Sequence, residues 1–164
     1  MTRIRLNTPS RFSPGNCEPA VLEAILVGRR RIQERLLHSV REDVDGGGSR
    51  HHLLLGPRGI GKTHLIALLN HRLRTDDGLV DRVVVAWMRE EERGVGSVEE
   101  LLLRILAALA RHDAVEIDLA DRIDALYDLP FEALRDGALG LLDEALRGRR
   151  LVVLIENLGM LFSR

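Results

Sequence analysis

The feature that most constrains this chain is a glycine-rich stretch that matches the pattern G-x-x-x-x-G-K-S/T at every fixed position. The stretch consists of Gly56, Pro57, Arg58, Gly59, Ile60, Gly61, Lys62 and Thr63, and His64 follows it. Glycines let a loop wrap so closely that successive backbone N–H groups point at one anion, and a helix that starts at the end of the loop adds its positive end. The pattern therefore predicts a phosphate-binding loop between a strand and a helix.

Each part of this loop has an expected task. Lys62 is expected to reach the β- and γ-phosphates of a nucleotide, and the Thr63 hydroxyl is expected to ligate Mg²⁺. Arg58 and His64 are counted among the candidate nucleotide-binding residues because they flank the fixed positions, although their side chains are expected to be exposed.

Apolar runs on both sides of the loop predict an α/β fold. Leu53–Leu55 is apolar without alternation, which is typical of a strand buried on both faces of a parallel sheet. The β-branched runs Val83–Trp87 and Leu151–Ile155 predict two further strands. Helical spacing of apolar residues predicts helices over 62–74, 97–112, 119–129 and 131–147. Ser97 and Glu100 form a capping box, Pro130 separates the last two helices, and Gly148 is the expected cap of the final one.

Length and composition indicate a single domain. The 164 residues are 45% apolar and 30% charged, as in globular proteins. Residues 1–18 are rich in proline and predict an irregular N-terminal arm, so the domain is expected over 19–164. Its first part is helical from 19 to about 44 with a break at Gly28, and the Asp45–Ser49 stretch predicts a flexible linker.

Charge and cysteine content limit the partners. The net charge of −1 gives no overall attraction to nucleic acid, so a DNA partner is possible but unsupported by charge. The basic cluster Arg29–Arg31 with Arg35 favours a solvated helix face, and the alternative is a phosphate- or partner-binding patch. A single cysteine, Cys17, excludes an internal disulfide and favours a reducing compartment. Without an apolar leader or a membrane-length apolar run, a cytoplasmic protein with no membrane partner is expected.

An acidic residue follows the last predicted strand. Nucleotide enzymes with this kind of loop need a carboxylate at the end of a neighbouring strand to hold the Mg²⁺ shell. Glu156 is the candidate for that metal-side role, and Asn157 takes the position of a water-activating base. An amide cannot accept a proton as a carboxylate can, so hydrolysis is left open while nucleotide binding is predicted.

Together these motifs resemble the AAA+ and STAND group of P-loop ATPases, nearest to the origin-recognition/initiator-like branch. The resemblance spans about 19–160 and rests on Ile25–Leu36, on the loop itself, and on the run from Val83 through Ser97 to Leu109. In this group a GR-containing box before the loop packs beside the adenine. The resemblance thus implies that Val27, Gly28 and Arg29 lie near the base, with ATP and Mg²⁺ as cofactors. It also implies a three-layer P-loop NTPase sandwich with a parallel sheet.

One departure from that group concerns strand order. The group's order, 5-1-4-3-2, places a sensor 1 strand between the loop strand and the acidic strand. No sensor 1 strand, arginine finger or C-terminal lid can be assigned in this chain. The resemblance therefore implies an incomplete sheet, and a larger polypeptide or a protein partner that completes it. The kinase/GTPase strand order, in which the two strands are direct neighbours, would leave no gap.

Three functions are compatible with these motifs. The leading hypothesis is ATP binding as part of an ATP-hydrolysing AAA+/STAND-type switch or motor, which makes the chain a possible ATPase. The alternative, motivated by Asn157, is a non-hydrolysing ATP-binding regulatory or interaction module. A small phosphotransferase is disfavoured because no acceptor-binding motif is found between residues 89 and 150.

Overall fold

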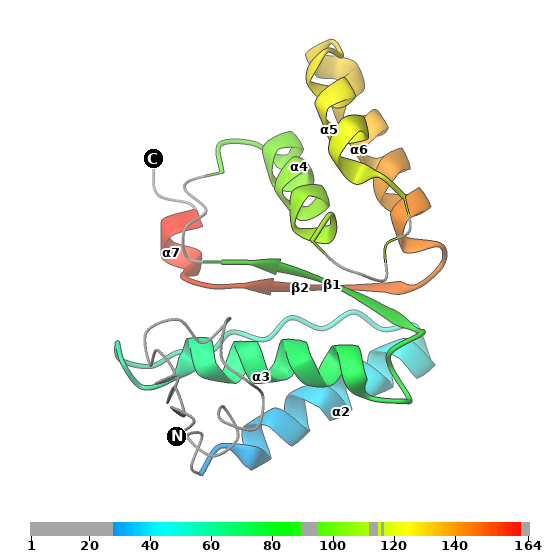
Figure 1. The fold of residues 1–164 in the computed structure, drawn as a ribbon. Coiled ribbons are helices and arrows are strands. Elements are labelled where there is room, and N and C mark those ends of the chain that lie inside the picture. The colour runs from blue at the N-terminus through cyan, green and yellow to red at the C-terminus, as the bar shows by residue number, and fades with distance from the viewer. Residues whose placement is uncertain (1–27, 90–94, 112–114, 116, 162–164) are drawn as a thin grey trace, which may run out of the picture.

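The computed structural model describes residues 28–89, 95–111, 115 and 117–161. Figure 1 shows a small sheet with helices on both sides. The N-terminal arm, Cys17, Val27 and the expected helix before Gly28 lie outside the described residues. In chain order the elements are α2 (Arg30–Gly46), α3 (Lys62–Thr75), β1 (Val83–Met88), α4 (Val98–Leu109), α5 (Leu119–Tyr127), α6 (Phe131–Leu146), β2 (Arg150–Ile155) and α7 (Leu158–Leu161).

The two strands pair in parallel, with Val83 opposite Arg150 and Met88 opposite Ile155. Successive side chains of a strand point to opposite faces, so each strand contributes to two cores. One face packs against α2 and α3, and the other against α4, α5 and α6. The α2–α3 face carries Val83, Val85, Trp87, Val152 and Leu154. The opposite face carries Val84, Ala86, Met88, Leu151, Val153 and Ile155.

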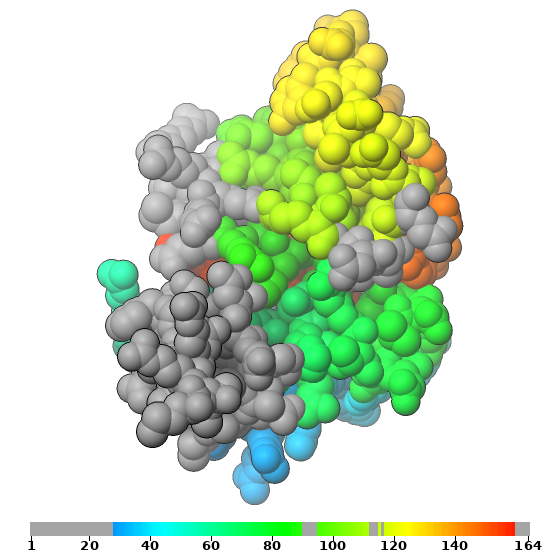
Figure 2. All heavy atoms as spheres, viewed as in Figure 1, coloured from blue at the N-terminus to red at the C-terminus, as the bar shows by residue number. Residues whose placement is uncertain are grey.

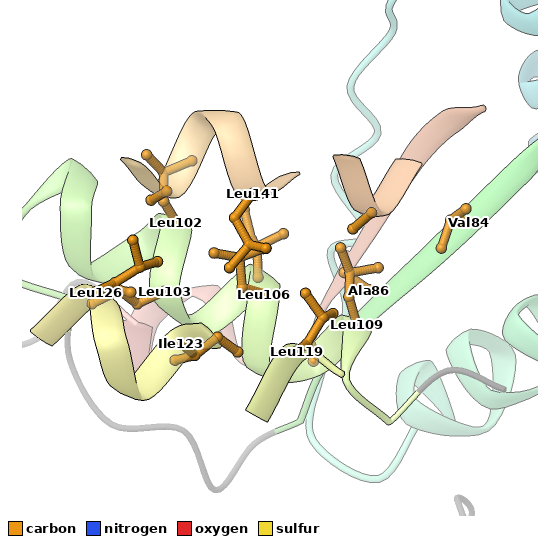
Figure 3. Packing of buried hydrophobic residues seen from close by; sticks show 14 of the residues in the cluster. Val84, Ala86, Leu102, Leu103, Leu106, Leu109, Leu119, Ile123, Leu126 and Leu141 are labelled. Atoms are coloured by element: carbon orange, nitrogen blue, oxygen red, sulfur yellow. The ribbon is translucent and has the colours of Figure 1, made fainter. Parts of the chain in front are cut away.

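The larger core lies between the sheet and α4–α6. In Figure 3, Val84 and Ala86 of β1 lie on the sheet side of this core, with Leu109 of α4 close by. Leu106 and Leu109 have no exposed surface. Figure 3 also shows leucines of α4, α5 and α6 facing one another. Branched aliphatic side chains build this core because aromatic residues are only 3% of the chain.

Helix ends follow local sequence closely. Ser97 Oγ accepts a hydrogen bond from the Glu100 N–H at 3.1 Å, which caps α4 as expected. The Glu100 carboxylate accepts from the Gly96 N–H at 2.8 Å, so the return bond of the expected capping box is displaced by one residue. At the end of α6, Arg147 and Gly148 both have a left-handed backbone, with φ of 48° and 77°.

The prediction of a buried strand at Leu53–Leu55 is wrong. The segment is irregular, and Leu53 and Leu55 are 65% and 84% exposed. Leu54 alone of the three packs against the α2–α3 core. In Figure 1 this cyan segment runs between the sheet and α3 without an arrow.

Leu53–Leu55 forms no ladder with either strand of the sheet. The Arg150 N–H donates to the carbonyl of Arg82, just before β1, at 2.8 Å, and the Glu156 N–H donates to that of Met88 at 3.0 Å. Backbone groups alternate in direction along a strand, so those of Leu151, Val153 and Ile155 point to the opposite edge. Among the described residues no strand pairs with that edge, and the sheet consists of β1 and β2. The kinase/GTPase order, which would pair the two directly, is absent from this part of the chain.

Polar contacts to α2, rather than strand pairing, hold the residues that lead into Leu53–Leu55. The Arg50 N–H donates to Asp43 Oδ2 at 3.0 Å, and His52 Nε2 lies 2.9 Å from Ser39 Oγ. Arg50 also pairs with Glu42, and this hydrogen bond lowers the pKa of that carboxyl. The chain is thereby fastened to α2 just before it enters the glycine-rich loop.

Candidate functional site

The glycine-rich loop lies at the carboxyl end of the sheet. Figure 1 shows the start of α3 at the same end of the molecule as the arrowheads of β1 and β2. Residues 56–60 are exposed, and in Figure 2 teal atoms of the loop project from the left margin. Ligands of parallel α/β sheets bind outside the carboxyl ends of the strands. The loop is therefore placed where such a sheet binds ligands.

Three glycines give the loop its shape. Gly59 and Gly61 have φ of 80° and 90°, a region that side chains other than glycine rarely adopt. A Cβ atom on Gly56 would lie only 3.1 Å from Ile60 Cγ2. Gly61 is the N-cap of α3, and its carbonyl accepts the Leu65 N–H at 3.1 Å. The first free N–H groups of α3 therefore follow directly after the second left-handed glycine.

Lys62, the only lysine of the chain, lies across the loop. Its Nζ donates to the carbonyl oxygens of Gly56 at 2.8 Å and Pro57 at 3.0 Å. The sequence predicts contact with phosphates instead. The ammonium group has three protons to donate, so these carbonyls and phosphate oxygens would compete for the same donor.

Arg29 is brought to the loop from the start of α2. A Cβ atom on Gly61 would lie 3.7 Å from Arg29 Nη1, so the guanidinium lies beside the N-terminus of α3. The positive end of α3 is thus flanked by Arg29 and Lys62, an arrangement that an anion would stabilise. Gly28 is exposed, with φ of 80°.

The two residues that flank the fixed positions differ in exposure. Arg58 is exposed as expected. His64 is half-buried, contrary to the expectation, because it lies in the first turn of α3.

Glu156 lies on the α3 face of the sheet. It continues the alternation of Val152 and Leu154, whose side chains pack on that face. Trp87 of β1 also packs there, and its Nε1–H donates to Glu156 Oε1 at 2.8 Å. The Arg89 guanidinium carbon lies 4.7 Å from the centroid of the Trp87 ring. Sequence reasoning missed Trp87 and Arg89, although counting alternate residues along both strands would place Trp87 on the same face as Glu156.

Asn157 has a structural reason to be asparagine. Its φ is 51°, a left-handed conformation in which asparagine is enriched among residues other than glycine. The residue is exposed and directly precedes α7. The backbone turn after β2 therefore accounts for this residue type without any role in catalysis.

The residues expected to hold a metal, Thr63 and Glu156, both offer oxygen donors, the kind of ligand that Mg²⁺ takes. In the described part of the chain, no group of three or more His, Cys, Asp or Glu side chains is placed to hold an ion. A metal at this site would take ligands from phosphate oxygens, the Thr63 hydroxyl and Glu156, which is how Mg²⁺ is commonly held. Within the same residues, no helix has both the length and the apolar character needed to cross a membrane.

A glycine-rich loop that opens a helix, at the carboxyl edge of a small parallel sheet, is compatible with the class of P-loop NTPases. Residues 25–162 match the family model of the AAA ATPase domain. The chain belongs to this family, which uses nucleotides and typically Mg²⁺. No curated protein and no solved structure matches the chain. The predicted AAA-type P-loop ATPase domain is confirmed, whereas the origin-recognition and STAND subtype stays a prediction.

Proposed function

We propose that this chain binds ATP at Gly56–Thr63 and acts as the nucleotide-dependent part of an AAA+/STAND-type switch or motor. The observation that carries the proposal is the loop itself: two left-handed glycines lead into α3, and Lys62 lies across them. Membership of the AAA ATPase family supports nucleotide use in general.

The phosphates are held by backbone and by charge. Free N–H groups at the start of α3 and in the loop point at phosphate oxygens, and the helix end contributes its partial positive charge. Lys62 exchanges its two carbonyl acceptors for the β- and γ-phosphates. Arg29 supplies a second cation beside Gly61. Arg58, Ile60 and His64 complete the proposed contacts.

The adenine base of ATP is assigned to the segment before α2. The resemblance of Ile25–Leu36 to the GR box supports a place for Val27, Gly28 and Arg29 near adenine, and hence a preference for ATP over GTP. The nearness of Arg29 to Gly61 agrees with this assignment, because base and phosphates belong to one ligand. Competition between ATP and GTP for the site measures the preference.

Mg²⁺ is assigned to Thr63 and Glu156 together with phosphate oxygens. An ion held there would supply neutralisation of the phosphate charge and polarisation of the phosphoryl group. Glu156 is held at the sheet edge by Trp87, on the face that also carries α3. The Asn157 amide cannot accept a proton as a carboxylate can, so turnover would need another base, for which Glu156 is the candidate. Hydrolysis is tested by measuring phosphate release from ATP, which we expect for the wild-type chain and not for Glu156→Gln.

A further strand is proposed to complete the sheet. One edge of β2 pairs with no strand in the described part of the chain, and Leu53 and Leu55 are exposed. Both observations support a slot between them for a strand from a further polypeptide segment, in the place of a sensor 1 strand. Hydrogen exchange tests this: the Leu151, Val153 and Ile155 amides exchange fast in the chain alone and slowly once the slot is filled. Fast exchange of the Val152 and Leu154 amides as well would contradict the alternation of N–H directions along β2.

The subtype and the compartment are also proposals. Ile25–Leu36 supports the origin-recognition/initiator-like branch, and the single cysteine supports a cytoplasmic location. We assign the domain to 19–164.

A binding assay with a fluorescent ATP analogue tests the proposed function. The wild-type chain is expected to bind it saturably, and Lys62→Ala is expected to lose binding. Arg122→Ala is the control, because it removes an exposed cation that pairs with Glu144 on α6. Equal binding by wild type and Lys62→Ala would remove the site assignment.

A further inference from the structure

We propose that Trp87 is a positioning residue, which orients the Glu156 carboxylate for Mg²⁺ through its indole N–H. The inference deepens the proposed function and rests on it. It assigns a specific task to the only tryptophan of the chain. The two residues are 69 positions apart in sequence and meet only because β1 and β2 pair.

The hydrogen bond has good geometry and a fixed backbone beneath it. The Nε1–Oε1 distance of 2.8 Å lies in the normal range for an N–H···O hydrogen bond. Trp87 lies opposite Leu154, two residues before Glu156. The Glu156 main-chain N–H donates to the Met88 carbonyl at 3.0 Å. The strand ladder thus fixes the Glu156 backbone, and Trp87 fixes one end of its side chain.

The indole itself is held in place. The half-buried Trp87 ring packs against the α2–α3 core. Arg89 lies over the ring at 4.7 Å, within the range of a cation–π contact. With the ring restrained by packing and by Arg89, the N–H bond has a defined direction. This direction meets the carboxylate at the sheet edge, on the face that also carries α3.

Such an arrangement affects the metal rather than the phosphates. An unrestrained glutamate loses rotamer freedom when it binds a metal, whereas a pre-oriented one has already lost it. Partners that orient a metal ligand typically change metal affinity by about 10–100-fold when removed. For a single neutral donor we expect the lower end, a rise of about tenfold in the Mg²⁺ concentration needed for half-saturation.

Trp87→Phe is the test variant, because it keeps an aromatic ring under Arg89 and removes the N–H donor. Tyr127→Phe is the matched control, because it removes the polar group of an exposed aromatic residue at the end of α5. Binding of the fluorescent ATP analogue is measured in EDTA and over a series of Mg²⁺ concentrations. We expect unchanged affinity in EDTA for both variants, and the tenfold shift in Mg²⁺ dependence for Trp87→Phe alone.

A double variant separates positioning from a general disturbance of the site. Glu156→Ala is expected to lose the Mg²⁺-dependent gain in affinity. Adding Trp87→Phe to Glu156→Ala is expected to cause no further loss, because the indole acts through the carboxylate. A further loss in the double variant would overturn the proposal.

A spectroscopic measurement decides the case even where Trp87→Phe does not fold. Labelling with ¹⁵N-tryptophan gives a single indole N–H signal, since the chain has one tryptophan. We expect this signal to move when Mg²⁺ is added to the ATP-bound wild-type chain, and to move when Glu156 is replaced by Ala. An indole signal that responds to neither change would overturn the proposal.

The outcomes distinguish this inference from the proposed function. If Lys62→Ala abolishes binding while Trp87→Phe keeps the wild-type Mg²⁺ dependence, the inference fails and the proposed function stands. If Trp87→Phe loses affinity in EDTA to the same extent as in Mg²⁺, Trp87 has a structural role and the inference fails. If the wild-type chain binds no nucleotide, both fail.

Discussion

Two glycines with the same backbone strain provide a matched test of the loop. Gly59 has φ of 80° and Gly148 has φ of 77°. A Cβ atom at either position would meet no other atom within 4 Å. Replacement by alanine therefore adds no steric clash at either site, and only the backbone conformation is disfavoured.

The size of the effect follows from the left-handed conformation, which costs about 1–2 kcal/mol for a residue with a side chain. Gly148 lies between α6 and β2, where the fold fixes the turn, so Gly148→Ala should lower the melting temperature by about 2–8 °C. Gly59 lies in an exposed loop that can relax to negative φ when empty. Binding of ATP would restore the strain, so Gly59→Ala should weaken binding by about 5–30-fold.

Titration calorimetry with ATP and thermal melts of both variants measure these effects. We expect Gly148→Ala to be less stable with unchanged ATP affinity, and Gly59→Ala to lose affinity with a smaller loss of stability. The reasoning is refuted if Gly59→Ala binds ATP as tightly as the wild type while Gly148→Ala is destabilised as expected. Equal losses of affinity in the two variants would refute the local origin of the effect.

Three further predictions concern the scaffold. Leu106→Ala should destabilise the chain by about 2–5 kcal/mol in urea unfolding, because the Leu106 side chain is fully buried. Leu139→Ala, at a 43% exposed position, should have a much smaller effect, and equal losses of stability in the two variants would contradict the assigned core. Ser97→Ala should cost about 1 kcal/mol by the same assay because it removes the α4 cap, and an unchanged midpoint would contradict that role. The hydrogen bond from Arg104 lowers the pKa of Glu100. The stabilisation of the fold by this ion pair should therefore be present above pH 4.5 and be lost as the pH falls through the lowered pKa of the folded state. Glu100→Gln should lack this loss in urea unfolding over that pH range, and the same acid dependence in variant and wild type would contradict the ion pair.

The strands and helices were predictable where local sequence decides the outcome. The β-branched run at Val83–Trp87 and the apolar run at Leu151–Ile155 each became a strand within one residue of the expected bounds. Leu53–Leu55 was not predictable in this way. Its composition suits a buried strand, but strand formation also needs a hydrogen-bonded neighbour, and composition does not reveal whether one is present.

The candidate site was predictable in its backbone and less so in its side chains. The spacing of Gly56, Gly61 and Lys62 predicted the loop and the start of α3. The position of the Arg29 guanidinium beside Gly61, and the hydrogen bond between Trp87 and Glu156, bring together residues far apart in sequence. Such contacts depend on how helices and strands pack, which no local pattern encodes.

Lys62 offers the most direct measurement of the central claim, that the loop Gly56–Thr63 holds the phosphates of ATP. Because the chain has a single lysine, labelling with ¹⁵N-lysine gives one backbone amide signal, at the first residue of α3. Titration with Mg·ATP should move this signal and saturate at one equivalent of nucleotide. A signal that stays in place at saturating ATP would contradict the proposed function.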